Sequence, residues 1–480
     1  MNYYLNLTIT CLIVFVKFKS SLSRNLDNEK TDRVLFSLNT PIWFSEGTHN
    51  SNKVLYKPVS PRSLHDALKF YENPKNMAGI NIEKNKLGNW YFTKHIESSR
   101  KSNEVHEKLG EIWTELFGKL HNNFTVDKNI KDSRNFKRSL TKSHVEGLSY
   151  RVNYDLPVYD GPDPIYPRIL LFVNFKENYT TDRDLRFYKL LIYLIAFWNS
   201  VDMEFTEFEF PSIKFHIAGI VVGNNEWAAP WLQPDPSFNS KFANNEKGWD
   251  NFYDYSNSND PLPDQWDIPI SQSDIGLCSN KNCWKPDISG MSVRGSTCNF
   301  LPRIKNAYTA ILILDDYSFK GIGTAAHEIG HAFGAYHDGD TKSLCEEHGF
   351  VMTSARSKER SSVESWSWCS KYGILLKLRN YSKVCWNFRP SIDKINEVAK
   401  ILPGHMVTPK DQCIARGYDD VCKKEISQCN ALFCKKNAIF GLDKYIDMLE
   451  NCEYANQPFA GSYCDPDSQC MNKKCLPISH

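Results

Sequence analysis

The sequence predicts an α/β domain built on a mixed twisted sheet with helices, followed by a small disulfide-rich module and preceded by a separate N-terminal segment. Three observations support this prediction. Strand and helix patterns alternate between residues 160 and 390, eight of the 15 cysteines lie within residues 402–480, and residues 24–150 contain no cysteine. A chain of 480 residues is long enough for this layout at roughly 100 to 200 residues per domain.

The composition gives no electrostatic reason to expect a nucleic-acid partner or a membrane-surface partner. Lysine and arginine total 58, aspartate and glutamate total 56, and the net charge is +2 at pH 7. Proteins that bind nucleic acid or anionic lipid normally carry a marked basic excess. The partner must therefore be inferred from a local site.

The first residues predict a signal peptide over residues 1–23. A mostly apolar run extends from Ile9 to Val16, and small residues follow near position 20. The basic start that usually precedes such a run is missing, so a buried strand is the alternative interpretation. No later stretch is apolar enough to span a bilayer, and we expect no membrane anchor.

Cysteine usage also indicates a secreted, extracellular protein. Only Cys11 precedes residue 278, which leaves 14 of the 15 cysteines, an even number, in the second half of the chain. Such a distribution is typical of disulfides formed in an oxidising compartment. Asn123, Asn178 and Asn380 each begin an Asn-x-Ser/Thr triplet and are candidate glycosylation sites.

Residues 24–150 are interpreted as a propeptide. They are rich in lysine, asparagine and serine and contain the dibasic pair Lys137-Arg138. A segment between a signal peptide and an enzyme domain is typical of a zymogen. Because dibasic pairs are common on solvated surfaces, a folded N-terminal domain of unrelated purpose is the alternative.

The predicted α/β domain, residues 160–390, contains strands and a long helix in alternating order. Buried strands are predicted over residues 168–175, 213–222 and 308–316. A helix is predicted over residues 182–200, capped by Thr181 or Asp182. This order indicates a central sheet with helices packed against it.

Residues 223–275 interrupt this pattern. They are rich in asparagine, aspartate, proline and tryptophan. We expect a long surface insertion there, because loops of this length usually lie outside the core.

The remaining cysteines fall into two groups. Six belong to the α/β domain and could form three disulfides, although six cysteines permit 15 pairings. They are Cys278, Cys283, Cys298, Cys345, Cys369 and Cys385. Eight belong to the module at 402–480: Cys413, Cys422, Cys429, Cys434, Cys452, Cys464, Cys470 and Cys475. Their spacing could also suggest zinc, but no histidines lie between them, and disulfides are the prediction.

The stretch "GTAAHEIGHAFGAYHDGD" has the spacing of a metal site. His327 and His331 are four residues apart, so on a helix they project from one face and can reach one ion. On a straight helix, His337 would lie roughly 9 Å beyond His331. Gly334 stands between, and glycine can adopt the left-handed conformation that ends a helix and reverses the chain. The pattern predicts three histidine ligands; an ordinary surface helix is the alternative.

The expected chemistry follows from zinc held by three neutral imidazoles. Zinc lowers the pKa of a bound water from about 15.7 towards 7 and polarises a peptide carbonyl. Glu328, next to the first histidine, would accept the proton of this water and pass it to the leaving amine. Asp338 follows the third histidine and could orient the site.

The stretch "HEIGHAFGAYHD" matches the HExxHxxGxxHD motif of the metzincin zinc peptidases at every position. The resemblance implies a methionine turn beneath the zinc, for which Met352 in "GFVMTS" is the candidate. The aspartate that ends the motif, Asp338, is a feature in which the chain resembles the reprolysin (adamalysin) branch. The stretches "AFWNSVDMEF", "IKFHIAGIVV" and "WSWCSKYGILLKL" also resemble this branch, and "ISGMSVRGSTC" occupies the place of its substrate-binding edge strand.

The tail resembles the disintegrin-like module of the ADAMTS proteases. The stretches that show this resemblance are "LPG", "QC" at Gln412-Cys413, "LFC" ending at Cys434 and "PFAGSYC" ending at Cys464. The similarity covers residues 160–475, and the short layout is similar to secreted reprolysins of arthropod saliva or venom.

The sequence departs from the family in two places. Many metzincin propeptides silence the zinc with a cysteine, but residues 24–277 contain none, so latency would need another device. The reprolysin branch commonly places a calcium-binding glutamate in the first catalytic strand, where this chain has Arg168. Calcium binding is therefore doubtful.

These observations predict a secreted zinc endopeptidase, made as a zymogen, that cleaves extracellular proteins. His327, His331 and His337 would bind zinc, Glu328 would be the general base, and Gly334, Met352 and Asp338 would support the site. The alternative is a binding or effector protein that acts through its cysteine-rich module with little or no catalysis; the intact Glu328 argues against it. A purely structural zinc site usually includes cysteine ligands.

Overall fold

The computed structural model describes parts of the N-terminal segment and most of the chain after residue 155. The described residues are 36, 40–48, 54–59, 63–72, 82–84, 90–92, 156–175, 183–234, 242–257, 266–280, 285–298, 309–340, 345–346, 349–353, 365–381, 386–390, 401–422, 429–435, 452–465 and 467–478. The predicted signal peptide, the pair Lys137-Arg138, Asn123 and Asn178 lie outside them. Asn380 is exposed on a helix.

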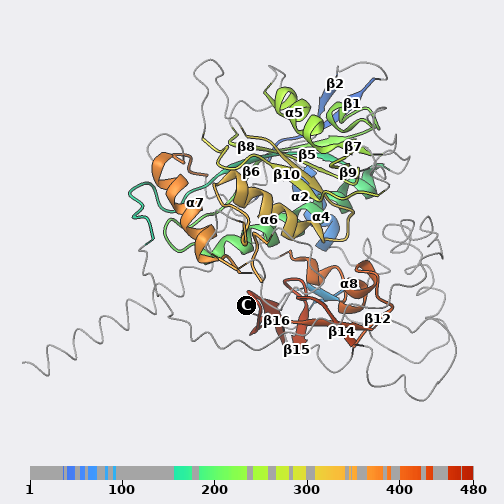
Figure 1. The fold of residues 1–480 in the computed structure, drawn as a ribbon. Helices are drawn as coiled ribbons and strands as arrows, with labels where there is room; N and C mark the ends of the chain where they lie inside the picture. The colour runs from blue at the N-terminus through green and yellow to red at the C-terminus, as the bar shows by residue number, and fades with distance from the viewer. Residues whose placement is uncertain are drawn as a thin grey trace, which may run out of the picture.

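A seven-stranded mixed sheet forms the centre of the larger body (Figure 1). Its order is β10-β11-β8-β5-β6-β1-β2. The strands are β1 (Ile42–Gly47), β2 (Val54–Pro58), β5 (Arg168–Asn174), β6 (His216–Gly223), β8 (Ile268–Ser273), β10 (Gly290–Ser292) and β11 (Ile311–Leu314). The five strands from β11 to β1 are parallel to their neighbours, and the two outermost strands, β10 and β2, are antiparallel.

Helices cover both faces of this sheet (Figure 1). They are α2 (Ser63–Glu72), α4 (Arg183–Glu204), η2 (Phe205–Glu207), η3 (Pro230–Leu232), α5 (Asn245–Ser256), α6 (Gly321–Ala332) and α7 (Trp368–Tyr381). Two short strands, β7 (Ala243–Asn244) and β9 (Leu277–Cys278), pair beside α5, and β3 (Ile82–Lys84) pairs with β4 (Trp90–Phe92). The predicted helix and strands are thus confirmed, with α4 extending four residues further than expected.

The central strand β5 shows why its sequence is continuously apolar. Ile169 and Leu171 belong to the core that α4 and α6 cover, whereas Leu170 and Phe172 belong to the core under α5. A strand buried on both faces loses the alternation of apolar and polar residues that marks a half-exposed strand. The sheet is therefore enclosed by two hydrophobic layers.

The prediction of a surface insertion over residues 223–275 was wrong. This range contains α5 and the central strand β8, whose residues are all buried. The strand was missed because its second half is polar. These polar groups are paired inside the protein: Trp231 Nε1 donates to Ser271 Oγ at 2.8 Å, and Trp198 Nε1 donates to Gln272 Oε1 at 3.1 Å. Buried hydrogen bonds offset the cost of removing such groups from water.

The N-terminal segment is not separate from the sheet in its described part. β1 pairs with β6, β2 covers the outer edge of β1, and α2 packs against α4. The strand and helix patterns in residues 42–72 are short and interrupted by polar residues, so this pairing could not be anticipated from the sequence.

The C-terminal module is a second, smaller body (Figure 1). It contains η5 (Pro403–His405), α8 (Pro409–Ala415), β12 (Asp420–Val421), β13 (Leu432–Lys435), β14 (Cys452–Asn456), β15 (Tyr463–Asp465), β16 (Ser468–Met471) and β17 (Lys474–Pro477). Its own buried cluster contains Cys413, Leu432 and Cys434. So small a core needs covalent staples.

Disulfides, rather than zinc, hold this module together, as predicted. The pairs are Cys413–Cys434, Cys422–Cys452, Cys429–Cys470 and Cys464–Cys475, and the larger body contains Cys345–Cys369. Cys278 and Cys298 are also disulfide-bonded, whereas Cys283 and Cys385 lie outside the described residues. Within the described ranges, no helix is both long and apolar enough to cross a membrane.

A buried polar cluster ties α4 to the strands beneath it. Tyr193 Oη donates to Asp315 Oδ2 at 2.6 Å, and Gln272 Nε2 donates to the same oxygen at 2.8 Å. Burial raises the pKa of Asp315 to about 7, although these two hydrogen bonds act in the opposite direction. The native protein therefore retains a proton that the unfolded chain releases near 3.8.

This cluster makes stability depend on pH. The folded-state pKa of Asp315 lies above its unfolded value, so the free energy of unfolding should fall as the pH rises from about 4 to about 7. Asp315→Asn keeps an acceptor for Tyr193 and Gln272 without the charge. We expect this variant to lose much of that decline in denaturant unfolding curves recorded across the window. The exposed Asp250→Asn should keep the wild-type decline, and an unchanged profile in Asp315→Asn would contradict this account.

Candidate metal centre

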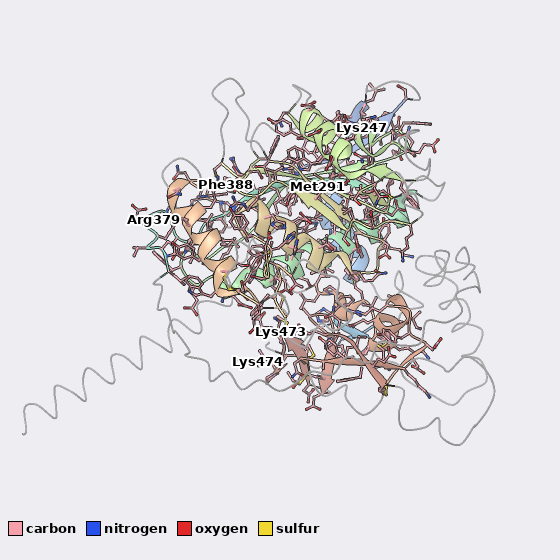
Figure 2. The ribbon with its side chains drawn as sticks, in the orientation of Figure 1. Lys247, Met291, Arg379, Phe388, Lys473 and Lys474 are labelled. Carbon is pink, nitrogen blue, oxygen red and sulfur yellow. A yellow bond between two sulfur atoms is a disulfide. The ribbon has the colours of Figure 1, made fainter. Side chains whose placement is uncertain are left out.

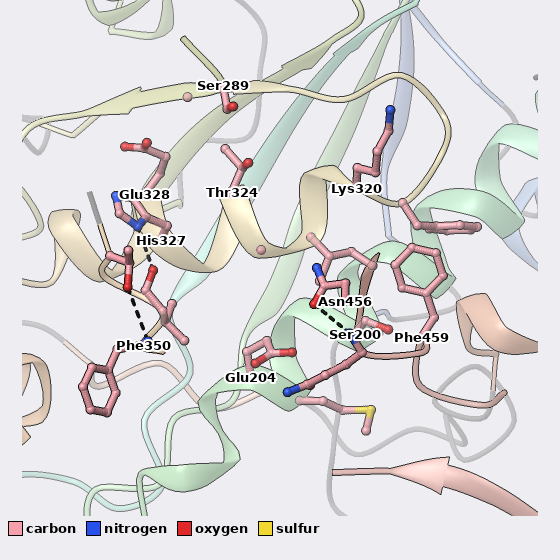
Figure 3. Close-up of a pocket in the computed structure, with 18 of the residues that line it drawn as sticks. Ser200, Glu204, Ser289, Lys320, Thr324, His327, Glu328, Phe350, Asn456 and Phe459 are labelled. Carbon is pink, nitrogen blue, oxygen red and sulfur yellow. Dashed lines mark hydrogen bonds between the residues drawn. The ribbon is translucent and has the colours of Figure 1, made fainter. Parts of the chain in front are cut away.

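Helix α6 presents two histidines on one face, as their four-residue spacing predicted. Its other face is buried against the core through Ala325, Ala326 and Ile329. His327 and His331 therefore face the opposite side, one turn apart, with their side chains partly exposed. Figure 3 shows His327 beside Glu328 on this helix.

The helix ends in a reversal centred on Gly334. The amide of Phe333 donates to the Ile329 carbonyl at 2.9 Å, and the amide of Ala335 donates back to Gly330 at 3.0 Å. Gly334 has φ = +113°, a conformation that side-chain-bearing residues rarely adopt. A Cβ there would also lie 3.1 Å from the Gly373 carbonyl oxygen of α7. Glycine thus allows the chain to turn and return beneath α7.

The reversal brings His337 to the two helical histidines. Its Nε2 atom lies 2.9 Å from Nε2 of His331 and 3.2 Å from Nε2 of His327. In His327 and His331 the other ring nitrogen faces a carbonyl oxygen: His327 Nδ1 lies 2.8 Å from Val351 O, and His331 Nδ1 lies 2.9 Å from Ala335 O. An Nδ1–H that donates to a carbonyl leaves the Nε2 lone pair free to bind a metal.

Burial favours the metal-binding form of these rings. It lowers the pKa of His331 to about 4 and lowers the pKa of His337 below its ordinary value. Both imidazoles are therefore neutral near pH 7 and can act as ligands without first losing a proton. Three imidazole nitrogens converging on one point fit a tetrahedral zinc ion with one open position.

Glu328 is the buried carboxylate of the site. Burial raises its pKa to about 7, and a hydrogen bond from Ser292 opposes this rise. Ser292 Oγ lies 2.7 Å from Glu328 Oε2 and 2.9 Å from the Glu328 carbonyl oxygen. The neighbouring Gly290 lies so close to α6 that a Cβ would meet Glu328 Cγ at 2.7 Å. The edge strand β10 and α6 are thus in direct contact at this carboxylate.

Met352 and Asp338 both lie close to the segment that carries the histidines. Met352 is fully buried, and a Cβ on Gly330 would meet its sulfur at 2.7 Å. The Asp338 amide donates to the Met352 carbonyl at 2.9 Å, and the Asp338 carboxylate accepts from Ser367 Oγ at 2.6 Å. Burial raises the pKa of Asp338. Asp338 therefore joins the His337 loop to both the Met352 turn and the start of α7.

A cleft of about 880 Å³ opens along these residues. The larger body lines it with β10, α6 and the end of α4, including Glu204. The C-terminal module contributes Arg416, Asn456, Phe459 and Lys473. Figure 3 shows Asn456 and Phe459 beside Ser200 of α4, and Figure 2 shows Lys473 at the margin of the module that faces the larger body.

Two contributors to the site were missed from sequence. Ser292 lies in a stretch assigned to the edge strand, but its contact with Glu328 joins residues 36 positions apart. Trp366 packs under α6, where a Cβ on Gly330 would meet its ring at 2.9 Å. Only the register of β10 against α6, which no local pattern encodes, could have identified Ser292.

The fold and the site together show the arrangement that the resemblance to the metzincins implied. A mixed sheet ends in an antiparallel edge strand, a helix below it carries two histidines, and a glycine reversal supplies the third. A buried methionine lies beneath them.

Comparison with known proteins agrees with this class. No family model matches the chain. The chain is 27% identical over 336 residues to a protein of Bombyx mori named "A disintegrin and metalloproteinase with thrombospondin motifs like". This match covers 66% of this chain and 45% of that protein. It is 28% identical over 228 residues to Venom metalloproteinase 3 of Eulophus pennicornis. This match covers 45% of this chain and 50% of that protein. The chain is thus similar to metalloproteinases of the reprolysin type.

Two further matches are more limited. The mouse protein "A disintegrin and metalloproteinase with thrombospondin motifs 7" is 26% identical over 217 residues, 44% of this chain and 12% of that protein. Metalloproteinase-II from Bacteroides fragilis aligns with a TM-score of 0.29 at 14% identity, over 46% of this chain and 56% of that structure. The matches in Bombyx mori and Eulophus pennicornis span about half of those relatives.

The glycine reversal can be tested through metal affinity. Gly334→Ala forces a side chain into a conformation that costs about 1–3 kcal/mol. Because the strain is relieved when the His337 loop shifts, we expect zinc affinity to fall by roughly tenfold or more, measured by competition with a chromophoric chelator.

A matched control distinguishes this effect from general backbone strain. Gly417, in the C-terminal module, also has a positive φ, +85°, and a Cβ added there would meet no atom within 4 Å. Gly417→Ala should leave zinc affinity unchanged. Equal zinc affinities in the two variants would show that the reversal does not hold the third ligand.

Proposed function

We propose that this chain is a secreted zinc endopeptidase that hydrolyses peptide bonds in extracellular proteins. The observation that carries the proposal is the convergence of three Nε2 atoms beside a buried carboxylate in an open cleft. His327, His331 and His337 would hold one zinc ion. Bound zinc supplies Lewis-acid polarisation of the scissile carbonyl and acidifies a water molecule.

Glu328 is the general base of the proposed reaction. Its carboxylate accepts the proton of the attacking water and then donates it to the leaving amine. Its raised pKa of about 7 suits both roles, because a group that exchanges protons near the working pH can act as base and then as acid. The hydrogen bond from Ser292 fixes one carboxylate oxygen and leaves the other to face the water.

Strand β10 is the proposed docking edge for an extended peptide. It is the last strand of the sheet and pairs with β11 on one side. A peptide that adds to such an edge gains main-chain hydrogen bonds, which give affinity with limited selectivity. Arg416, Asn456 and Phe459 of the disulfide-rich module line the same cleft, so we assign the module a role in positioning protein substrates.

The remaining expectations form part of the proposal. Disulfides at every described cysteine support folding in an oxidising compartment and hence secretion. We retain the domain assignments of residues 1–23 as signal peptide, 24–150 as propeptide, 160–390 as catalytic domain and 402–480 as disintegrin-like module. Arg168 forms an ion pair with Asp267 at 2.9 Å. A positively charged side chain therefore stands at the position where the reprolysin branch commonly has a calcium-binding glutamate. The proposal therefore includes zinc alone.

The central test compares wild type with Glu328→Gln, which removes the base and preserves the side-chain volume. Both proteins are loaded with zinc, cut after residue 138 through an inserted specific-protease site, and given a denatured protein substrate. We expect Glu328→Gln to lower the rate constant of cleavage at least about a hundredfold. A zinc chelator should abolish wild-type activity.

Glu346→Gln is the matched control because it makes the same change at an exposed glutamate of the same domain. It should retain wild-type activity. If zinc-loaded, folded wild type were as inert as Glu328→Gln, the protease proposal would fail and the binding-protein alternative would gain support.

A second prediction concerns Ser292. Removing its hydroxyl in Ser292→Ala leaves Glu328 less well oriented, and kcat should fall by about tenfold, the effect of losing a hydrogen bond to a charged group. KM should change little. Loss of this bond also raises the pKa of Glu328 further, so the acid limb of the activity profile should move to higher pH. Ser292→Thr should restore kcat, and failure of that rescue would contradict the assignment.

A further inference from the structure

The edge of the sheet opposite β10 is completed by the N-terminal segment. β1 pairs in parallel with β6 from Ile42 opposite Ile220 to Ser45 opposite Gly223. The amide of Ile220 donates to the Pro41 carbonyl at 3.0 Å. The amide of Asn224 donates to the Ser45 carbonyl at 2.8 Å. Without β1, these backbone groups of β6 would form an open sheet edge.

The end of β1 is held by side chains of the larger body. Asn225 Oδ1 accepts from the Gly47 amide at 3.0 Å, and Asn225 Nδ2 donates to the Gly47 carbonyl at 2.8 Å. Asn224 Nδ2 donates to Glu46 Oε1 at 2.6 Å. A Cβ on Gly47 would meet the Trp227 carbonyl oxygen at 1.8 Å, so the backbones touch at a distance that only glycine permits.

The segment also supplies part of the main hydrophobic core. Its fully or nearly fully buried side chains are Phe36, Ile42, Leu64, Ala67 and Leu68. They share one cluster with β5, α4 and α6, and the ring centroids of Phe44 and Phe187 lie 5.0 Å apart. Removal of the segment would expose this apolar surface to water.

These contacts lie away from the active-site cleft. Among the described residues, none of those that line the cleft precedes Ser200. β1 and β2 lie at the opposite end of the sheet from β10 (Figure 1). The segment therefore completes the sheet and the core without occupying the site.

We propose that β1, β2 and α2, together the N-terminal unit, stay bound as a noncovalent second chain after the polypeptide is cut between residues 93 and 155. The mature protein is then a two-chain particle, and release of the N-terminal unit is not the step that opens the cleft. The inference rests on sheet pairing and burial, and holds whether or not the proposed function is correct.

The test cuts the purified full chain at a specific-protease site inserted after Arg138. Size-exclusion chromatography in native buffer, with mass spectrometry of each peak, then shows whether the fragments co-elute. We expect co-elution at a ratio of one to one. Complete separation, with the larger fragment still folded, would overturn the proposal.

Two variants test the docking geometry. Gly47→Val should release the N-terminal fragment after cutting, because its side chain cannot fit against the Trp227 carbonyl. Leu55→Val introduces the same residue at an exposed position of β2, where the native side chain is 62% exposed, and should leave the fragment bound. Retention of the Gly47→Val fragment at wild-type strength would contradict the proposed docking.

Hydrogen exchange gives a readout that does not depend on how well a variant folds. In cut wild-type protein, the amides of Ile220 and Asn224 should remain as protected as in the uncut chain, because both donate to β1 or to its preceding residue. Rapid exchange of both amides after cutting would reject the proposal. Co-elution and protection without any peptidase activity would support this inference while contradicting the proposed function.

Discussion

The site depends on one backbone event, the reversal of the chain at Gly334. α6 alone can offer two histidines on one face, and a continued helix would carry His337 away from them. The reversal places the third imidazole within 3.2 Å of the other two and sends the chain on to Asp338, whose amide bonds to the Met352 carbonyl. The Met352 turn, the start of α7 and the three histidines are thus positioned together.

The sequence predicted those features that depend only on residues close together in the chain. The four-residue spacing of His327 and His331, and the glycine between His331 and His337, are properties of one helix and one turn. The buried strand β5 and the helix α4 were also predictable, because long apolar runs are normally buried in the hydrophobic core. The disulfide chemistry of the tail followed from cysteine density.

Features that depend on pairing between distant segments were not predictable. β8 is central although half of it is polar, because Trp198 and Trp231 supply hydrogen bonds from elsewhere in the chain. β1 joins the sheet through a register that is set by Asn225 and by the lack of a side chain at Gly47. The cysteine pairing belongs to the same group, since eight cysteines allow 105 connectivities.

The most direct test of the three-histidine site is zinc K-edge X-ray absorption on the purified full chain. We predict one zinc ion with nitrogen and oxygen neighbours at about 2.0–2.1 Å and the multiple-scattering pattern of three imidazoles. In His337→Ala, one imidazole should disappear from that pattern. A sulfur neighbour near about 2.3 Å, or an unchanged pattern in His337→Ala, would show that zinc binds elsewhere and would contradict the central claim.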